Sequence, residues 1–140
     1  MKQFDFETEL QVRDYECDIQ GIVNNAVYLN YLEHCRHKFL QSFGIAFARL
    51  HNEGVDAVVI RAELEYKSSL RPGDEFLVRL KIKRQGSLRV VFDQQVVRKN
   101  DEKLIVKAKI TTVLTRNRKP IAPDMLLDVV KQSGIDIPEI

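Results

Sequence analysis

The segment Asp18-Ile19-Gln20-Gly21-Ile22-Val23-Asn24-Asn25-Ala26-Val27-Tyr28 separates two different hydrophobic patterns. Before it, residues 4–12 alternate between apolar and polar positions, which is typical of a strand with one buried face. After it, apolar residues recur at steps of three and four from about residue 27 to 43, which predicts an amphipathic helix, and Gly44 suits its end. The chain is therefore expected to open with a strand, a loop and a long helix.

Most of the remaining sequence alternates with a period of two. It predicts strands over residues 58–66, 76–82, 88–96 and 104–114, with turns at 71–74, 85–87 and 99–102. In the first of these strands the predicted inward positions are Val58, Ile60, Ala62, Leu64 and Tyr66. Short helices are expected at 47–52 and at 124–131, the latter with Asp124 as its N-cap.

The connections between these last four strands are short, which predicts an antiparallel meander. The long helix needs a large apolar surface to cover it, and only the sheet offers one. We therefore predict an α+β fold in which one long central helix is wrapped by a curved five-stranded antiparallel sheet. The outer face of this sheet carries Arg, Lys and Glu, as a solvated face should.

The length and composition of the chain limit the kinds of protein that it can be. The 140 residues, 44% hydrophobic and 30% charged, predict a single globular domain over residues 1–140. The net charge of +2 gives no reason to expect nucleic acid, and no apolar run suggests a membrane span. Cys17 and Cys35 make no disulfide framework, and no signal peptide is evident, so a cytoplasmic location is predicted.

The segment after the first strand combines three chemical features. Asp18 places a carboxylate on an irregular loop, and Gly21 permits a close approach between backbone and ligand. The free N–H groups at the helix start, near Asn24 and Asn25, are suited to stabilising a developing oxyanion. This combination fits an acyl-transfer site. The alternative is that Asp18 only shapes the turn. Cys17 has no suitably placed His and is not expected to act as a nucleophile.

Residues 12–36 resemble the 4-hydroxybenzoyl-CoA thioesterase family of hot-dog proteins. The resemblance is carried by an Asp, two residues and a Gly, then Val-Asn-Asn, a Tyr, and a helical Glu followed by Arg. It implies that Asp18 attacks the thioester carbonyl or activates a water, and that the Asn25 backbone N–H polarises that carbonyl. It also implies a dimer of side-by-side sheets, often doubled to a tetramer, with the site at the subunit boundary.

The predicted substrate-binding positions are Gly21, Ile22, Val23, Asn24, Tyr28 and Glu33. Tyr28 fits core packing as well as an acyl pocket. Many relatives with Val-Asn-Asn have a His before the Val, where this chain has Ile22. Asp18 is therefore the only acid–base candidate expected on the loop.

The helix itself offers further candidates. Glu33 and Arg36 are three residues apart, which favours an ion pair on the helix surface. His34 and His37 have a spacing that can hold a metal, but no third ligand is evident, so no metal is predicted. Cys35 lies on the apolar stripe and is expected in the core.

Lys67, Arg84 and Arg89 are the predicted coenzyme A contacts, the last two beside the Gly86-Ser87 turn; the alternative is a solvated surface. The function predicted is hydrolysis of acyl-CoA to the free acid and CoA, with CoA as part of the substrate and no other cofactor. Two alternatives are an acyl-carrier-protein thioesterase and a non-catalytic hot-dog protein that binds acyl-CoA.

Overall fold

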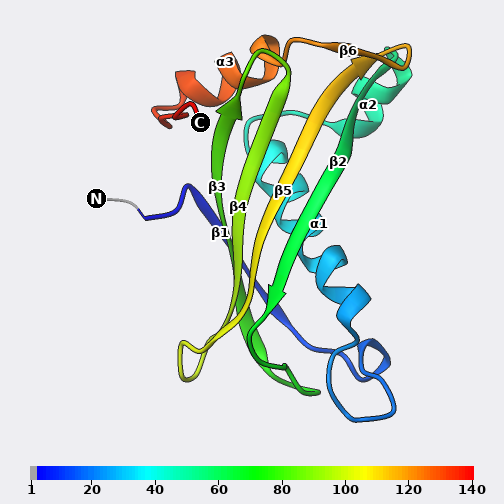
Figure 1. The fold of residues 1–140 in the computed structure, drawn as a ribbon, viewed down its shortest axis with the longest axis vertical. Coiled ribbons are helices and arrows are strands. Elements are labelled where there is room, and N and C mark those ends of the chain that lie inside the picture. The colour runs from blue at the N-terminus through cyan, green and yellow to red at the C-terminus, as the bar shows by residue number, and fades with distance from the viewer. Residues whose placement is uncertain (1–2) are drawn as a thin grey trace.

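The long helix α1 (Asn25–Gln41) lies against a curved antiparallel sheet in the computed structural model, which describes residues 3–140 (Figure 1). The strands are β1 (Phe6–Gln11), β2 (Val55–Tyr66), β3 (Glu75–Gln85), β4 (Arg89–Arg98), β5 (Leu104–Arg116) and β6 (Lys119–Ile121). The shorter helices are η1 (Asp14–Glu16), α2 (Phe47–Asn52) and α3 (Asp124–Gln132). The predicted helix wrapped by a curved antiparallel sheet is confirmed. None of the helices in residues 3–140 has the length and apolar character needed to cross a membrane.

The strand order is β1-β3-β4-β5-β2, with β6 paired to β5. The predicted four-strand meander is therefore wrong, because only β3, β4 and β5 follow one another, while β2 pairs with β5 at the far edge. The connection at residues 67–74 instead crosses the end of the sheet. Its backbone groups bond first to Ile105 of β5 and then to Val12 after β1, so the crossing leaves these polar groups satisfied.

The core lies between α1 and the inner face of the sheet. Leu32, Cys35 and Phe39 of α1 are fully buried, as are Val78 and Leu80 of β3. These positions are three or four apart on the helix and two apart on the strand, so both periodicities meet at one interface. The predicted core position of Cys35 is confirmed, and burial raises the pKa of its thiol to about 11.

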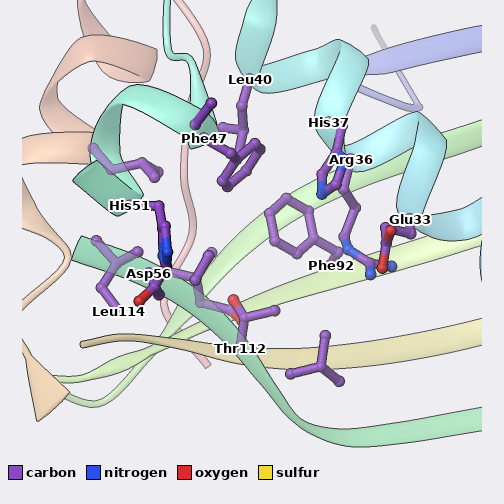
Figure 2. Close-up of a pocket in the computed structure, with 15 residues that line it drawn as sticks. Glu33, Arg36, His37, Leu40, Phe47, His51, Asp56, Phe92, Thr112 and Leu114 are labelled. Atoms are coloured by element: carbon purple, nitrogen blue, oxygen red, sulfur yellow. The ribbon is translucent and has the colours of Figure 1, made fainter. Parts of the chain in front are cut away.

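β2 departs from strict alternation. Its pairing with β5 shifts register between Val59 and Arg61, which is a β-bulge. As a result Ala57 and Val59, rather than Val58, line a cavity of about 390 Å³ between the helices and the sheet (Figure 2). The prediction that Val58 points inward is therefore wrong. The extra residue of the bulge reverses which side chains face the core in the part of β2 that precedes it.

The C-terminal helix differs from its prediction at one position. The N-cap of α3 is Pro123, and Asp124 is the first helical residue. The Asp124 carboxylate accepts a hydrogen bond from Arg84 Nη1 at 2.7 Å. Asp124 therefore connects α3 to the end of β3, and in the described part of the chain α3 has no side-chain capping hydrogen bond.

Candidate active site

Asp18 begins a tight loop between η1 and α1. Its backbone N–H donates to the Ile22 carbonyl at 2.9 Å, and its carbonyl accepts from the Gly21 N–H at 3.0 Å. Gly21 has φ +75°, a conformation that favours glycine. Asp18 is half-buried, and its Oδ1 accepts from the Gln20 N–H at 2.8 Å. Asp18 therefore does help to form the turn, but within residues 3–140 only one of its carboxylate oxygens is hydrogen-bonded.

Asn25 is the first residue of α1. The Asn24 side chain caps the helix by accepting from the Ala26 N–H at 3.0 Å. The Asn25 N–H has no hydrogen-bond partner in the part of the chain described. It stands at the positive end of a 17-residue helix, where a partial negative charge is stabilised. The structure thus leaves an unused donor at the predicted oxyanion position.

The loop is anchored to the core by Val23, which is 1% exposed. The Val23 N–H donates to the Leu70 carbonyl at 2.9 Å, and the Leu70 N–H donates to the Tyr28 hydroxyl at 3.1 Å. Tyr28 is also 1% exposed, so it lies in the core. A second tie joins the Tyr31 hydroxyl to Glu16 Oε1 at 2.9 Å. These contacts hold both ends of the loop against α1.

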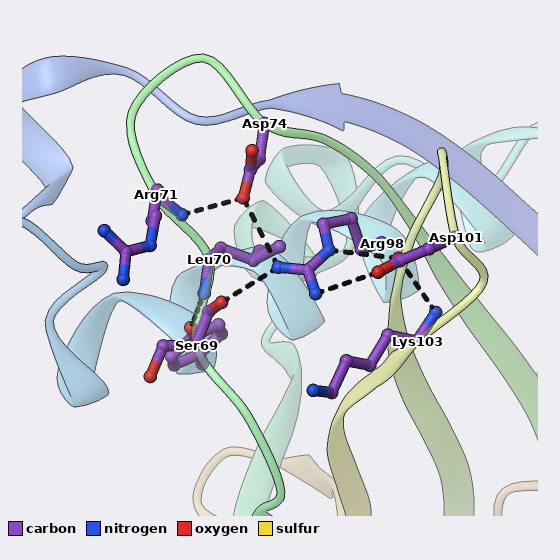
Figure 3. A network of polar contacts seen from close by, with 8 residues as sticks. Ser69, Leu70, Arg71, Asp74, Arg98, Asp101 and Lys103 are labelled. Carbon is purple, nitrogen blue, oxygen red and sulfur yellow. Dashed lines mark hydrogen bonds and ion pairs between the residues drawn. The ribbon is translucent and has the colours of Figure 1, made fainter.

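A polar network fixes the segment that carries Leu70 (Figure 3). Arg98 of β4 forms two hydrogen bonds of 3.0 Å to the Asp101 carboxylate. The same guanidinium donates to the Ser69 carbonyl at 3.4 Å and lies 3.8 Å from Asp74. A bidentate guanidinium–carboxylate pair has a defined geometry. The Asp18 loop is therefore supported by residues from distant parts of the chain.

Tyr28→Phe should destabilise this support. The Leu70 N–H would lose its acceptor while staying buried, which costs about 1–3 kcal/mol of unfolding free energy. Urea unfolding measures this loss. Tyr15→Phe is the control, because Tyr15 is 77% exposed and its change should stay within about 0.5 kcal/mol. Equal stabilities of the two variants would show that Tyr28 contributes packing alone.

The cavity of about 390 Å³ lies along the C-terminal half of α1 (Figure 2). Its walls are mainly apolar, with Leu40, Phe47 and Phe92 among them. Glu33 and Arg36 lie on one side, and of the described residues 3–25, which include Asp18, none lines the cavity. Glu33 was predicted to bind substrate together with the Asp18 loop, but within one chain it lines a cavity that the loop does not reach.

Arg36 is not on the helix surface, as the predicted pair with Glu33 required. It is 8% exposed, and the ion pairs formed by residues 3–140 do not include one between Glu33 and Arg36. Its Nη1 instead donates to Gln94 Oε1 of β4 at 3.0 Å. The predicted ion pair is wrong, because Arg36 lies on the side of α1 that faces the sheet, whereas Glu33 is exposed.

The cavity also holds a pair that sequence reasoning missed. His51 Nδ1 lies 2.6 Å from Asp56 Oδ1, and both residues line the cavity (Figure 2). They flank the turn at Gly54 between α2 and β2. In the sequence, the only indication of this pair is a His and an Asp on either side of a glycine turn. The structure is needed to show that α2 and β2 bring the two side chains together.

The three predicted CoA contacts lie in different places. Lys67 follows β2 at the end of the sheet that carries Leu70, and its Nζ is 2.8 Å from Glu65 Oε2. Arg84 and Arg89 flank the β3–β4 turn at the opposite end (Figure 1). Arg84 is engaged by Asp124 and by nearby carbonyls. One chain therefore does not gather these three side chains around Asp18.

The fold of this chain has counterparts among known structures. A structure of a 1,4-dihydroxy-2-naphthoyl-CoA thioesterase from Synechocystis superposes with a TM-score of 0.86 at 18% identity, covering 94% of this chain and 98% of that one. A hypothetical protein from Aquifex aeolicus superposes with a TM-score of 0.82 at 30% identity, covering 89% of this chain and 98% of that one. These likenesses establish the hot-dog fold.

Sequence comparison gives related results. A chloroplastic acyl-acyl carrier protein thioesterase of Arabidopsis thaliana is 38% identical over 112 residues, which are 80% of this chain and 59% of the relative. The chain thus spans about three fifths of that relative. A putative esterase of Aquifex aeolicus is 30% identical over 122 residues, covering 86% of this chain and 94% of the relative. The model of the thioesterase-like superfamily matches residues 12–130, which include the Asp18 loop, α1 and strands β2 to β5, and the chain belongs to that superfamily.

Proposed function

We propose that this protein hydrolyses acyl thioesters, with Asp18 as nucleophile or general base. The observation that carries the proposal is that one short loop has the half-buried Asp18 at its beginning and the unused Asn25 N–H of α1 at its end. Membership of the thioesterase-like superfamily supports it. Two of the relatives compared above are named as thioesterases, and one as a putative esterase.

Two routes fit this arrangement. In one, the Asp18 carboxylate attacks the carbonyl carbon and expels the thiolate, water then hydrolyses the resulting anhydride, and a proton released from that water converts the thiolate to the thiol. In the other, Asp18 takes a proton from a water that attacks the same carbon, and the proton passes to the departing thiolate. In both, the carbonyl oxygen becomes negative and accepts a hydrogen bond from the Asn25 N–H. Gly21, Ile22 and Asn24 are the loop positions proposed to contact the thioester.

Acyl-CoA is the proposed substrate. The motif resembles that of 4-hydroxybenzoyl-CoA thioesterases, which favours CoA. The second candidate is acyl carrier protein, favoured by the names of the Arabidopsis relatives. Thiol release from matched acyl-CoA and acyl-carrier-protein substrates separates the two. Binding of both without thiol release would instead support the non-catalytic alternative. The cytoplasmic location stays a prediction.

The proposed active unit is a homodimer, paired through β2. This edge strand exposes Val58, Val59 and Ile60 at 42%, 44% and 47%. An unpaired apolar edge is a template for another strand, and two-fold pairing joins the same edge of each copy. Two β2 strands related in this way run antiparallel, and so do their α1 helices. The Asp18 loop of one copy is then brought towards the cavity of the other, which completes the site. Further doubling to a tetramer stays a prediction.

Basic side chains are proposed to hold the phosphates of CoA. Lys67→Ala and Arg89→Ala should each raise KM for acyl-CoA by about twofold to fivefold, since exposed ion pairs contribute little individually. KM should also rise with salt, because such contacts are screened. The same variants should keep wild-type KM for an acyl-pantetheine, which lacks the nucleotide. Unchanged KM for acyl-CoA in both variants would place the phosphates elsewhere. Arg84→Ala is a poorer probe, because it also breaks the tether to Asp124.

A further inference from the structure

Arg36 is a buried cation whose hydrogen-bonding capacity is mostly unused. A guanidinium carries five N–H donors, and in residues 3–140 only Nη1 finds an acceptor, Gln94 Oε1. Gln94 is itself 1% exposed and donates to the Leu32 carbonyl at 3.1 Å, so its position is fixed. The contact to Gln94 orients the guanidinium but leaves the remaining donors free.

Those free donors face the cavity. Arg36 lines the cavity and extends from α1 towards the strands between Glu33 and Phe92 (Figure 2). In residues 3–140, a side-chain polar atom that has neither a hydrogen-bond partner nor solvent contact is found at Thr8, and none is found at Arg36. Its unbonded nitrogens must therefore be reached from the cavity, because the residue as a whole is only 8% exposed.

A cation in this position is costly. Burial lowers the pKa of Arg36, and the nearby Glu33 carboxylate offsets this only in part. The adjoining walls are apolar, with Val90 and Leu114 on the strands. A buried charge without a partner is destabilising, so packing alone would favour an apolar side chain here. A ligand atom that accepts hydrogen bonds would remove this cost.

We propose that Arg36 is a specificity-determining residue that binds an oxygen on the acyl group, a carbonyl or a carboxylate separate from the thioester. This rests on the proposed thioesterase function. The cavity of about 390 Å³ lies within the size range of small-molecule sites, and its apolar walls suit the carbon chain. Arg36 then supplies the few convergent polar donors that give such a pocket its selectivity.

The test compares thioesters of equal chain length. Octanoyl-CoA carries no further oxygen, 3-oxooctanoyl-CoA carries a carbonyl near the thioester, and octanedioyl-CoA carries a carboxylate far from it. At least one oxygenated substrate should exceed octanoyl-CoA in kcat/KM by roughly tenfold to a hundredfold, as a hydrogen bond to a charged donor allows. The substrate with the higher kcat/KM shows whether Arg36 binds a carbonyl or a carboxylate.

The variants assign that preference to Arg36. Arg36→Met keeps an unbranched stem without donors and should bring the ratio close to one, while Arg36→Lys should keep part of it. Lys38→Met is the matched control, because it removes a positive charge from the same helix outside the cavity and should leave the ratio unchanged. Since each ratio is measured within one variant, loss of folded protein cancels.

The proposal can fail independently of the thioesterase function. Equal kcat/KM for all three substrates in the wild type would overturn the role of Arg36 and leave the hydrolase intact. Calorimetric titration of the wild type and of Arg36→Met with octanamide and with the monoamide of octanedioate gives a readout without turnover, because only the second compound carries a carboxylate. If no thioester is cleaved but the monoamide binds more tightly than octanamide through Arg36, the oxygen site stands and the thioesterase proposal falls. Neither turnover nor selective binding would overturn both.

Discussion

Asp18→Asn is expected to lower thioester turnover by roughly a hundredfold or more, the usual contribution of a positioned general base. Asn has nearly the same shape and can still accept from the Gln20 N–H, so the loop should keep its conformation. It lacks the negative charge that attacks a carbonyl or takes a proton from water. The Asn25 N–H remains available, so substrate binding should change little.

Steady-state thiol release and thermal unfolding together check this expectation. Asp14→Asn is the matched control, because it neutralises an exposed carboxylate four residues earlier and should keep near wild-type turnover. The opposing view is that Asp18 only shapes the turn. An Asp18→Asn enzyme with wild-type turnover and an unchanged Tm would support that view and remove Asp18 from the mechanism.

Ile60→Lys is expected to weaken self-association by roughly a hundredfold or more. In an isologous interface the substitution places two new charges on the same contact, and like charges there cost several kcal/mol, with about 1.4 kcal/mol per tenfold in Kd. Ile60 is 47% exposed in the single chain, so its own fold should tolerate the change. Sedimentation measures the shift from dimer towards monomer.

Turnover should fall together with association, because the proposed site takes its Asp18 loop from one copy and its cavity from the other. Leu88→Lys is the control, since Leu88 is 38% exposed near the β3–β4 turn, away from β2. A wild-type protein that sediments as a monomer at micromolar concentration would refute the dimer. A monomeric but fully active Ile60→Lys variant would show that one chain holds the complete site.

Sequence by itself determined the local elements of this protein. The change from period two to period 3.6 around Asp18 predicts the strand, the loop and α1, because each period depends on neighbouring residues. The turn signal at Gly21 and the capping preference of Asn24 are local in the same sense. The fold class and the architecture of the loop followed from these patterns together with the resemblance they carry.

Tertiary structure alone decided which distant elements meet. The pairing of β2 with β5 joins segments about fifty residues apart, and its bulge changes which side chains enter the cavity. Arg36 is three residues from Glu33, so spacing suggested a surface pair, whereas the sheet supplies Gln94 as its partner. Arg84 likewise meets Asp124 forty residues later. Such contacts depend on strand order and register, which short-range patterns do not specify, and they decide where the polar groups of the cavity lie.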